Sequence, residues 1–177
     1  SSGLLLALKA LRLPPGSQVL TSACGFPATL APILHCGFKP VFVDAELPSH
    51  NIDIAQAIDK IKRVWERVTP RGPIRAVILA HTLGNPVDLT PHFLAMCKIR
   101  HISVIEDCCE AVGTTYQDKP VGSLGRLGVF SFYPSHQMTA LGGGGMVVCQ
   151  EATLAHRLRS LRDWGKRSDR STVKVYQ

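Results

Sequence analysis

Short, fully apolar runs alternate along the chain with segments whose apolar residues recur every three or four positions. The run IRAVILA at 74–80 is typical of a strand buried on both faces, whereas the spacing in 51–68 is typical of an amphipathic helix. We therefore expect strands at 17–23, 39–45, 74–80, 102–107, 127–133 and 145–150, and helices at 4–12, 27–37, 51–68, 91–99 and 151–164.

This alternation of strand and helix predicts an α/β fold, a three-layer α/β/α sandwich with a mainly parallel sheet. No internal repeat interrupts the pattern. Ligands of such folds bind beyond the carboxyl ends of the strands. The candidate site residues are therefore those that directly follow strands: Phe26, His81, Asn85, Asp107, Ser131 and His136.

The composition of the 177 residues is that of a folded domain, with 45% hydrophobic and 19% charged residues. The net charge of +7 is dispersed until RLRSLRDWGKRSDR near the C-terminus, and no aromatic residues interleave a basic groove. The charge therefore indicates a solvated helix face with a mild preference for anionic ligands, and not a nucleic-acid partner.

The six cysteines show no C-x-x-C spacing and lie mostly in apolar runs, which predicts free thiols in a reducing compartment and no metal site. The run GLLLALKAL is too short to span a bilayer and lacks the features of a signal peptide, so we expect a cytoplasmic protein without a membrane partner. The abrupt beginning and end of the chain suggest a fragment of a longer protein.

Two polar elements flank predicted secondary structure. In VIEDCCEA, Asp107 ends an apolar strand, where a partly buried carboxylate must find a cation or hydrogen-bond donors. A helix cap or a structural ion pair would satisfy it equally well. Ser1, Ser2 and Gly3 stand at a helix start, where free N–H groups and hydroxyls can cradle a phosphate or simply cap the helix.

The segment FSFYPSHQMTALGGGG joins the last two predicted strands. His136 follows a turn at Pro134 and could act as a proton shuttle near neutral pH, although many such histidines are only hydrogen-bonded loop residues. The glycines at 142–145 precede a strand, so they form neither a dinucleotide fingerprint nor a P-loop. They would instead let the backbone pass close to a ligand or a neighbouring subunit.

Nearly from end to end, the chain resembles the DegT/DnrJ/EryC1/StrS family of sugar aminotransferases. The resemblance rests on the segments above and on SACGFPATLAPIL, KPVFVDAE, AHTLGNPVDL and LRDWGK. Members of this family are fold-type I vitamin B6 enzymes. The resemblance is closest to the nucleotide-sugar 3-dehydrases of that family, which have histidine where other members have the lysine that binds the cofactor covalently. His136 occupies this position.

The resemblance implies roles for individual residues. Asp107 would pair with the pyridinium nitrogen of the cofactor, and Phe26 would stack on its ring. Ser1, Ser2 and Ser131 would bind its phosphate, Glu110 would approach the ring hydroxyl, and His81 and Asn85 would lie beside the ring. Family members are about twice this length. Residues 1–177 would thus be a large domain without its N-terminal segment and C-terminal small domain, in a homodimer that completes the active site.

The implied activity is a pyridoxamine 5'-phosphate-dependent 3-dehydration of a 4-keto-6-deoxy nucleotide sugar in deoxysugar or polysaccharide biosynthesis, with His136 as catalytic base. The alternatives are a pyridoxal 5'-phosphate-dependent sugar aminotransferase that uses another lysine, such as Lys119, and a non-catalytic remnant. Leu141 and Gly142 replace the usual Gly-Glu, and no cysteine follows LRDWGK, which argues against an iron–sulfur cluster. A reductase partner remains an open alternative.

Overall fold

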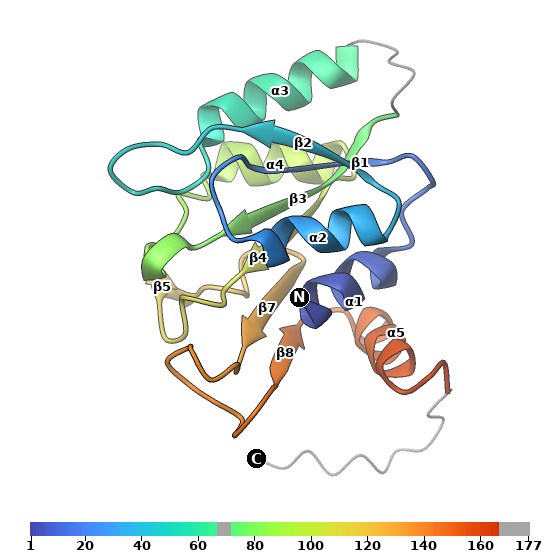
Figure 1. Ribbon diagram of the computed structural model, residues 1–177. Coiled ribbons are helices and arrows are strands. Elements are labelled where there is room, and N and C mark those ends of the chain that lie inside the picture. The colour runs from blue at the N-terminus through green and yellow to red at the C-terminus, as the bar shows by residue number, and fades with distance from the viewer. Residues whose placement is uncertain (67–71, 167–177) are drawn as a thin grey trace.

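The computed structural model describes residues 1–66 and 72–166 (Figure 1). The elements in chain order are α1 (Ser2–Leu11), β1 (Gln18–Ser22), α2 (Pro27–His35), β2 (Lys39–Val43), α3 (Ile54–Glu66), β3 (Ile74–Ala80), η1 (Thr82–Gly84), α4 (Pro91–Ile99), β4 (Ser103–Asp107), β5 (Thr115–Tyr116), β6 (Lys119–Pro120), β7 (Leu127–Ser131), β8 (Gly145–Val148) and α5 (Ala152–Arg162). The helix expected over 51–68 begins at Ile54, and its expected last two positions lie outside the described residues.

Six strands form one sheet in the order β2-β1-β3-β4-β7-β8. Neighbouring strands are parallel from β2 to β7, and β8 is antiparallel to β7, so the predicted mainly parallel sheet is confirmed. The strand order reverses at β1, because β2 lies on one side of it and β3 on the other. A crevice opens at such a reversal, outside the carboxyl ends of the strands, and it is the usual ligand site of this architecture.

Helices cover both faces of the sheet, which confirms the three-layer arrangement (Figure 1). Successive side chains of a strand point to opposite faces. In β3, Val77 and Leu79 therefore join a core with residues of α3 and α4, while Ala76 and Ile78 join a second core with residues of α1, α2 and α5. The continuous apolar runs of the central strands follow from this two-sided burial.

The segment between β7 and β8 departs from the expected strand lengths. β7 ends at Ser131, two residues earlier than predicted, and the chain then loops out through Pro134, which cannot donate to a strand ladder. The N–H groups of Phe132 and Ala140 close this loop by donating to the carbonyls of Gly144 and Phe132, at 2.9 and 3.0 Å. His136 is thereby presented on a loop at the end of the sheet.

A small hairpin of β5 and β6 was not predicted from the sequence. Its turn residues Gln117 and Asp118 both have positive φ angles of 49° and 61°. Two-residue hairpins of this kind usually carry Asn-Gly or Asp-Gly, so the sequence lacked the usual signal.

All six cysteines are free, as predicted. Cys97 and Cys108 are buried, whereas Cys24 is exposed, so the expectation of buried thiols does not extend to it. Among the residues that the structure describes, no helix combines the length and the apolar character needed to cross a membrane.

Candidate functional site

A broad cavity of about 1440 Å³ lies at the carboxyl ends of β3, β4 and β7. Its lining includes eight of the nine candidate residues: Ser1, Ser2, Phe26, His81, Asp107, Glu110, Ser131 and His136. Asn85 is not among the lining residues; it is exposed, and its side-chain amide donates to the carbonyl of Ser49 at 3.5 Å. The topology of the sheet, more than proximity in sequence, brings the eight together.

Asp107 is the last residue of β4 and is nearly buried, with 6% of its surface exposed. Its Oδ2 accepts a hydrogen bond from the Thr29 hydroxyl at 2.7 Å, and its Oδ1 accepts one from the Cys109 N–H at 3.3 Å. The carboxylate makes no ion pair within the described chain. Since a carboxylate has about four acceptor sites, Asp107 keeps capacity for a ligand donor or cation.

The N-terminus of α1 opens into the same cavity. Ser1 is the N-cap residue, but its hydroxyl makes no capping hydrogen bond, so the first-turn N–H groups are not capped by a side chain. Ser131 lies across the cavity at the end of β7. Gly3 allows the close approach, because a Cβ there would lie 2.7 Å from Cγ1 of Val129 on β7. Free helix N–H groups with nearby hydroxyls are suited to an anion such as phosphate.

Phe26 is the N-cap residue of α2, and 76% of its surface is exposed although its ring is apolar. Thr29 follows it by three residues, so both side chains lie on the same face of α2 and both line the cavity. An exposed aromatic ring in the same cavity as a nearly buried carboxylate can stack on a planar, positively charged ligand ring. Thr29 was missed from the sequence, although its helical spacing from Phe26 could have indicated it.

His136 is held on its loop by its own N–H, which donates to the carbonyl of Tyr133 at 3.0 Å. Its Nδ1 lies 3.0 Å from Oε1 of Glu110, and the His136 side chain is 16% exposed. The distance is that of an ion pair, although the two groups are not aligned as a hydrogen bond. Glu110 and His136 lie in different loops, and the sequence pattern did not predict this contact.

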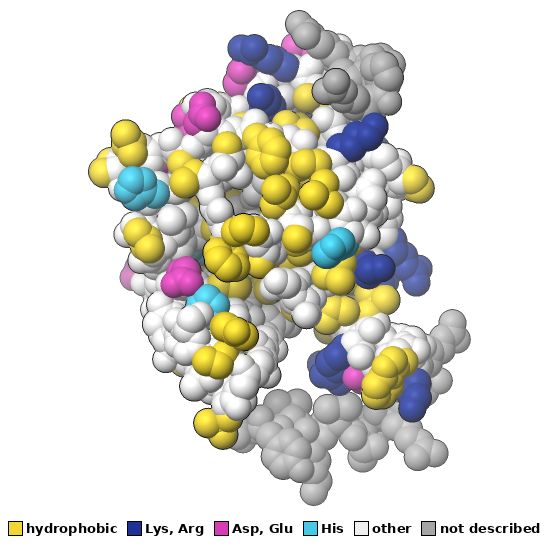
Figure 2. Space-filling view, viewed as in Figure 1, with side chains coloured by type: hydrophobic (Ala, Val, Ile, Leu, Met, Phe, Trp, Pro, Cys, Tyr) yellow, Lys and Arg dark blue, Asp and Glu magenta, His cyan; other side chains and the backbone are white. Residues whose placement is uncertain are grey.

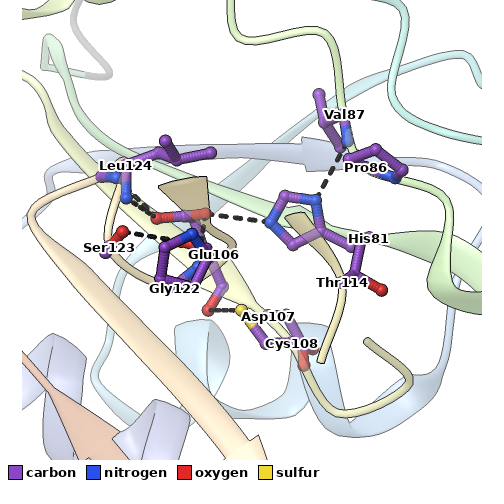
Figure 3. Close-up of polar contacts among 12 residues, drawn as sticks. His81, Pro86, Val87, Glu106, Asp107, Cys108, Thr114, Gly122, Ser123 and Leu124 are labelled. Carbon is purple, nitrogen blue, oxygen red and sulfur yellow. Dashed lines mark hydrogen bonds and ion pairs between the residues drawn. The ribbon is translucent and has the colours of Figure 1, made fainter. Parts of the chain in front are cut away.

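His81 lines the cavity, but both of its ring nitrogens are bound within the protein (Figure 3). Nδ1 accepts a hydrogen bond from the N–H of Val87 at 3.0 Å, so the ring proton must reside on Nε2. Nε2 lies 3.0 Å from Oε2 of Glu106 and donates to it. Both ring nitrogens of His81 are therefore hydrogen-bonded within the protein and are not available to a ligand.

Glu106 is completely buried at the centre of this network (Figure 3). In addition to His81, it accepts hydrogen bonds from the N–H groups of Gly122 at 2.7 Å, Leu124 at 2.8 Å and Gly125 at 2.5 Å. Burial raises the pKa of this carboxyl, but the hydrogen bonds from His81 and the backbone outweigh it and leave the pKa below its usual value. The ionised carboxylate thus anchors the loop between β6 and β7.

His81, Glu106 and Cys108 also place three potential metal-ligand atoms within 4.8 Å of one another. The nitrogen and oxygen donors already serve in hydrogen bonds, and burial raises the pKa of the Cys108 thiol, so it stays protonated and is a poor ligand. We therefore assign this cluster to the stability of the fold.

α5 contributes two arginines to the cavity lining, Arg159 and Arg162. Arg162 is paired with Asp163 at 2.8 Å, while Arg159 makes no ion pair within residues 1–66 and 72–166. The sequence indicated a solvated basic face for this helix; the structure shows that part of this face borders the cavity and favours anionic ligands there.

The family model for the DegT/DnrJ/EryC1/StrS aminotransferase family matches residues 1–176 of the chain. The chain is 41% identical over 180 residues to the lipopolysaccharide biosynthesis protein RfbH of Salmonella typhimurium, covering 94% of this chain and 37% of that protein. It is 42% identical over 174 residues to the dTDP-4-dehydro-2,6-dideoxy-D-glucose 3-dehydratase of Saccharopolyspora spinosa, covering 94% of this chain and 35% of that protein.

The structure is also similar to that of E coli GDP-4-keto-6-deoxy-D-mannose-3-dehydratase with bound hydrated PLP. The TM-score is 0.77 at 29% identity, and the match covers 91% of this chain and 40% of that one. The chain therefore spans well under half the length of each of these three proteins.

Proposed function

The chain belongs to the DegT/DnrJ/EryC1/StrS aminotransferase family, and from that membership we propose that residues 1–177 are the large domain of a pyridoxamine-phosphate-dependent 3-dehydrase. Its substrate would be a 4-keto-6-deoxy sugar linked to a nucleotide. Two of the similar proteins support this substrate class, since both are named as 3-dehydratases of nucleotide-linked keto sugars.

The observation that carries the proposal is the nature of the basic side chains in the cavity. His136 lines it together with Asp107, and no lysine occurs among the lining residues of the described chain. An imidazole cannot form the covalent bond to a carbonyl cofactor that a lysine amine forms, but it can accept and return a proton near neutral pH. This favours proton transfer on a non-covalently held cofactor over amine transfer through a lysine.

The residues present fit such a cofactor. Ser1, Ser2, Ser131 and the free N–H groups of α1 would bind its phosphate, and Phe26 would stack on its ring. Asp107, which has no cationic partner within the described residues, would keep the ring nitrogen protonated. When bound, pyridoxamine phosphate would supply a primary amine and an electron-accepting ring.

The protein's own catalytic contribution would come mainly from His136. The imidazole of His136 lines the cavity. There it would accept a proton that is removed from carbon and donate it to the departing 3-hydroxyl group, which leaves as water. Asp107 would stabilise the positive charge on the cofactor's ring nitrogen. Its nearly buried position strengthens this charge interaction.

We further propose that a second copy of the protein completes the cavity. Hydrophobic side chains gather on the face in Figure 2, over α2, β2 and the loops at the open ends of the strands. Phe26 and Leu83 line the cavity yet are 76% and 75% exposed. Exposed apolar patches mark sites of interaction with another protein or a ligand, and we assign the part beyond the cofactor to a second copy. A reductase acting on the product is an additional candidate partner.

The test uses the full-length protein with pyridoxamine phosphate and a 4-keto-6-deoxy nucleotide sugar, with the products followed by mass spectrometry. We expect loss of the 3-hydroxyl group, and a decrease of at least about a hundredfold in turnover for His136→Asn. His156→Asn, a change at an exposed histidine of α5, is the matched control and should retain activity. Transfer of an amine by the wild type without loss of the hydroxyl would refute the proposal.

The family description supports a second candidate, a sugar aminotransferase. This activity requires a lysine, and Lys119, the nearest one before β7, lies exposed on β6 and does not line the cavity. Addition of pyridoxal phosphate followed by borohydride reduction should trap any lysine that binds the cofactor covalently. A stable adduct, located by peptide mass spectrometry, would favour the aminotransferase over the dehydrase.

A further inference from the structure

Two loops that are distant in sequence meet at His136. Glu110 follows β4, and His136 follows β7, which is the neighbour of β4 in the sheet. The side-chain amide of Gln137 donates to the backbone carbonyl of Glu110 at 3.2 Å, so the loops are also joined next to the side-chain contact. The approach of Glu110 to His136 is therefore built into the packing of the two loops.

The two nitrogens of the His136 ring lie in different environments. Nδ1 is withdrawn from solvent and lies 3.0 Å from Oε1 of Glu110. Nε2 makes no hydrogen bond within the described chain, yet it is not buried as Nδ1 is. Because His136 lines the cavity, Nε2 is the nitrogen open to it. A proton on Nδ1 sets positive charge against the Glu110 carboxylate at this distance, whereas a deprotonated Nδ1 would set its lone pair against it.

Other ionisable groups share the cavity but do not compete for this contact. They are the N-terminal amine of Ser1 and the side chains of His81, Asp107, Cys109, Tyr133, Cys149, Arg159 and Arg162. His81 is bound to Glu106, Arg162 is paired with Asp163, and burial raises the pKa of the Cys109 thiol, which keeps it neutral. Within residues 1–66 and 72–166, Glu110 is the acidic group at ion-pair distance from His136.

We propose that Glu110 is a positioning residue that keeps the proton of neutral His136 on Nδ1, which leaves the lone pair of Nε2 directed to the cavity. When Nε2 takes up a proton, the imidazolium retains its Nδ1 proton next to the carboxylate, which stabilises the charge; the Nε2 proton then leaves by the same route. This inference rests on the proposed role of His136 as proton carrier. It differs from the role that resemblance implied for Glu110, contact with the cofactor's ring hydroxyl.

The tautomer of His136 can be measured directly in the ¹⁵N-histidine-labelled protein by two-bond ¹H–¹⁵N correlation, with His136→Asn used to assign the signals. The wild type is expected to show mainly the Nδ1–H form. Glu110→Ala should shift the ratio toward Nε2–H by roughly tenfold, the size expected for loss of an opposite charge beside the protonated nitrogen. Glu110→Gln keeps the side-chain volume and should give an intermediate ratio, and Glu110→Asp should restore most of the wild-type ratio.

Glu46→Ala is the control, since Glu46 is an exposed carboxylate that contacts Ser49 and lies outside the cavity. An unchanged His136 tautomer in Glu110→Ala, or an equal change in the control, would overturn the inference. The measurement needs neither cofactor nor substrate, so it is independent of the proposed function: a wild type that fails to deoxygenate the sugar disproves that function and leaves the tautomer result standing.

Discussion

Glu106 and Asp107 are adjacent carboxylates at the end of one strand, yet they have different surroundings. Successive residues of β4 point to opposite faces, and Glu106 points to a loop network while Asp107 points to α2 and the cavity. Glu106 receives hydrogen bonds from four donors of this chain, and Asp107 from two. Burial is similar, so the difference lies in how completely the protein satisfies each carboxylate.

Two histidines, His81 beside Glu106 and His136 beside Glu110, show the same contrast. His81 uses both ring nitrogens to join the fold. His136 has one nitrogen beside Glu110 and the other open to the cavity. A buried polar group whose partners are all internal indicates a structural role, whereas one with spare capacity at a cavity indicates a ligand site.

The largest effect is expected from removal of the charge at Glu106. Glu106→Gln keeps the size of the side chain but replaces an accepting oxygen by an NH₂ group among N–H donors, which leaves buried donors without partners. We expect a loss of about 3–5 kcal/mol in the free energy of unfolding, measured by urea denaturation. The control Asp59→Asn breaks an exposed pair with Arg63 at 2.8 Å and should cost less than about 1 kcal/mol. Equal effects in the two variants would contradict the structural role of Glu106.

A smaller effect is expected when wild-type Glu106 is titrated. Its pKa is lowered in the folded state, so the unfolded chain binds the proton more readily. The stability from Glu106 is therefore fully present above the ordinary carboxyl pKa and is lost as the pH falls through the lowered one. Urea unfolding of the wild type and Glu106→Gln at several acidic pH values should show their difference shrinking as the pH decreases. A difference that stays constant would contradict an ionised Glu106.

The smallest effect on stability is expected at Asp107. Asp107→Asn keeps an oxygen that can accept from Thr29 or Cys109, so the free energy of unfolding should decrease by only about 1 kcal/mol. Pyridoxamine phosphate binding, followed by fluorescence, should by contrast weaken at least tenfold, because an amide cannot neutralise a protonated ring nitrogen. A stability loss as large as that of Glu106→Gln, with unchanged binding, would remove the distinction between the two carboxylates.

Much of the fold could be predicted because the strands are buried on both faces. A run such as 74–80 admits few alternatives to a central strand, and the expected helix at 91–99 agrees with α4 residue for residue. Both β7 and β8 were predicted two residues too long. Phe132 and Tyr133 continue the apolar pattern of β7, but the paired register ends at Ser131, opposite Gly145. The β5–β6 hairpin has only two residues per strand, too few for a periodic signal.

The candidate site was partly predictable for a similar reason. Residues that follow parallel strands converge at one edge of the sheet, so Phe26, Asp107 and His136 could be grouped from sequence order alone. Asn85 also follows a strand, but the turn at Thr82–Gly84 carries it away from the cavity, toward Ser49. Such a turn, with Leu83 at a positive φ of 55°, has no clear sequence signal.

The sequence by itself determined the layered α/β architecture and the residues available at the carboxyl edge of the sheet, because hydrophobic burial and strand direction act through local pattern. Only the tertiary structure decided which polar groups are partners. Whether a histidine meets Glu106 or Glu110, and whether its second nitrogen is covered or open, depends on contacts between segments about 25 residues apart in sequence. Hydrogen bonds require angstrom-scale placement, and that placement comes from the packing of the whole sheet.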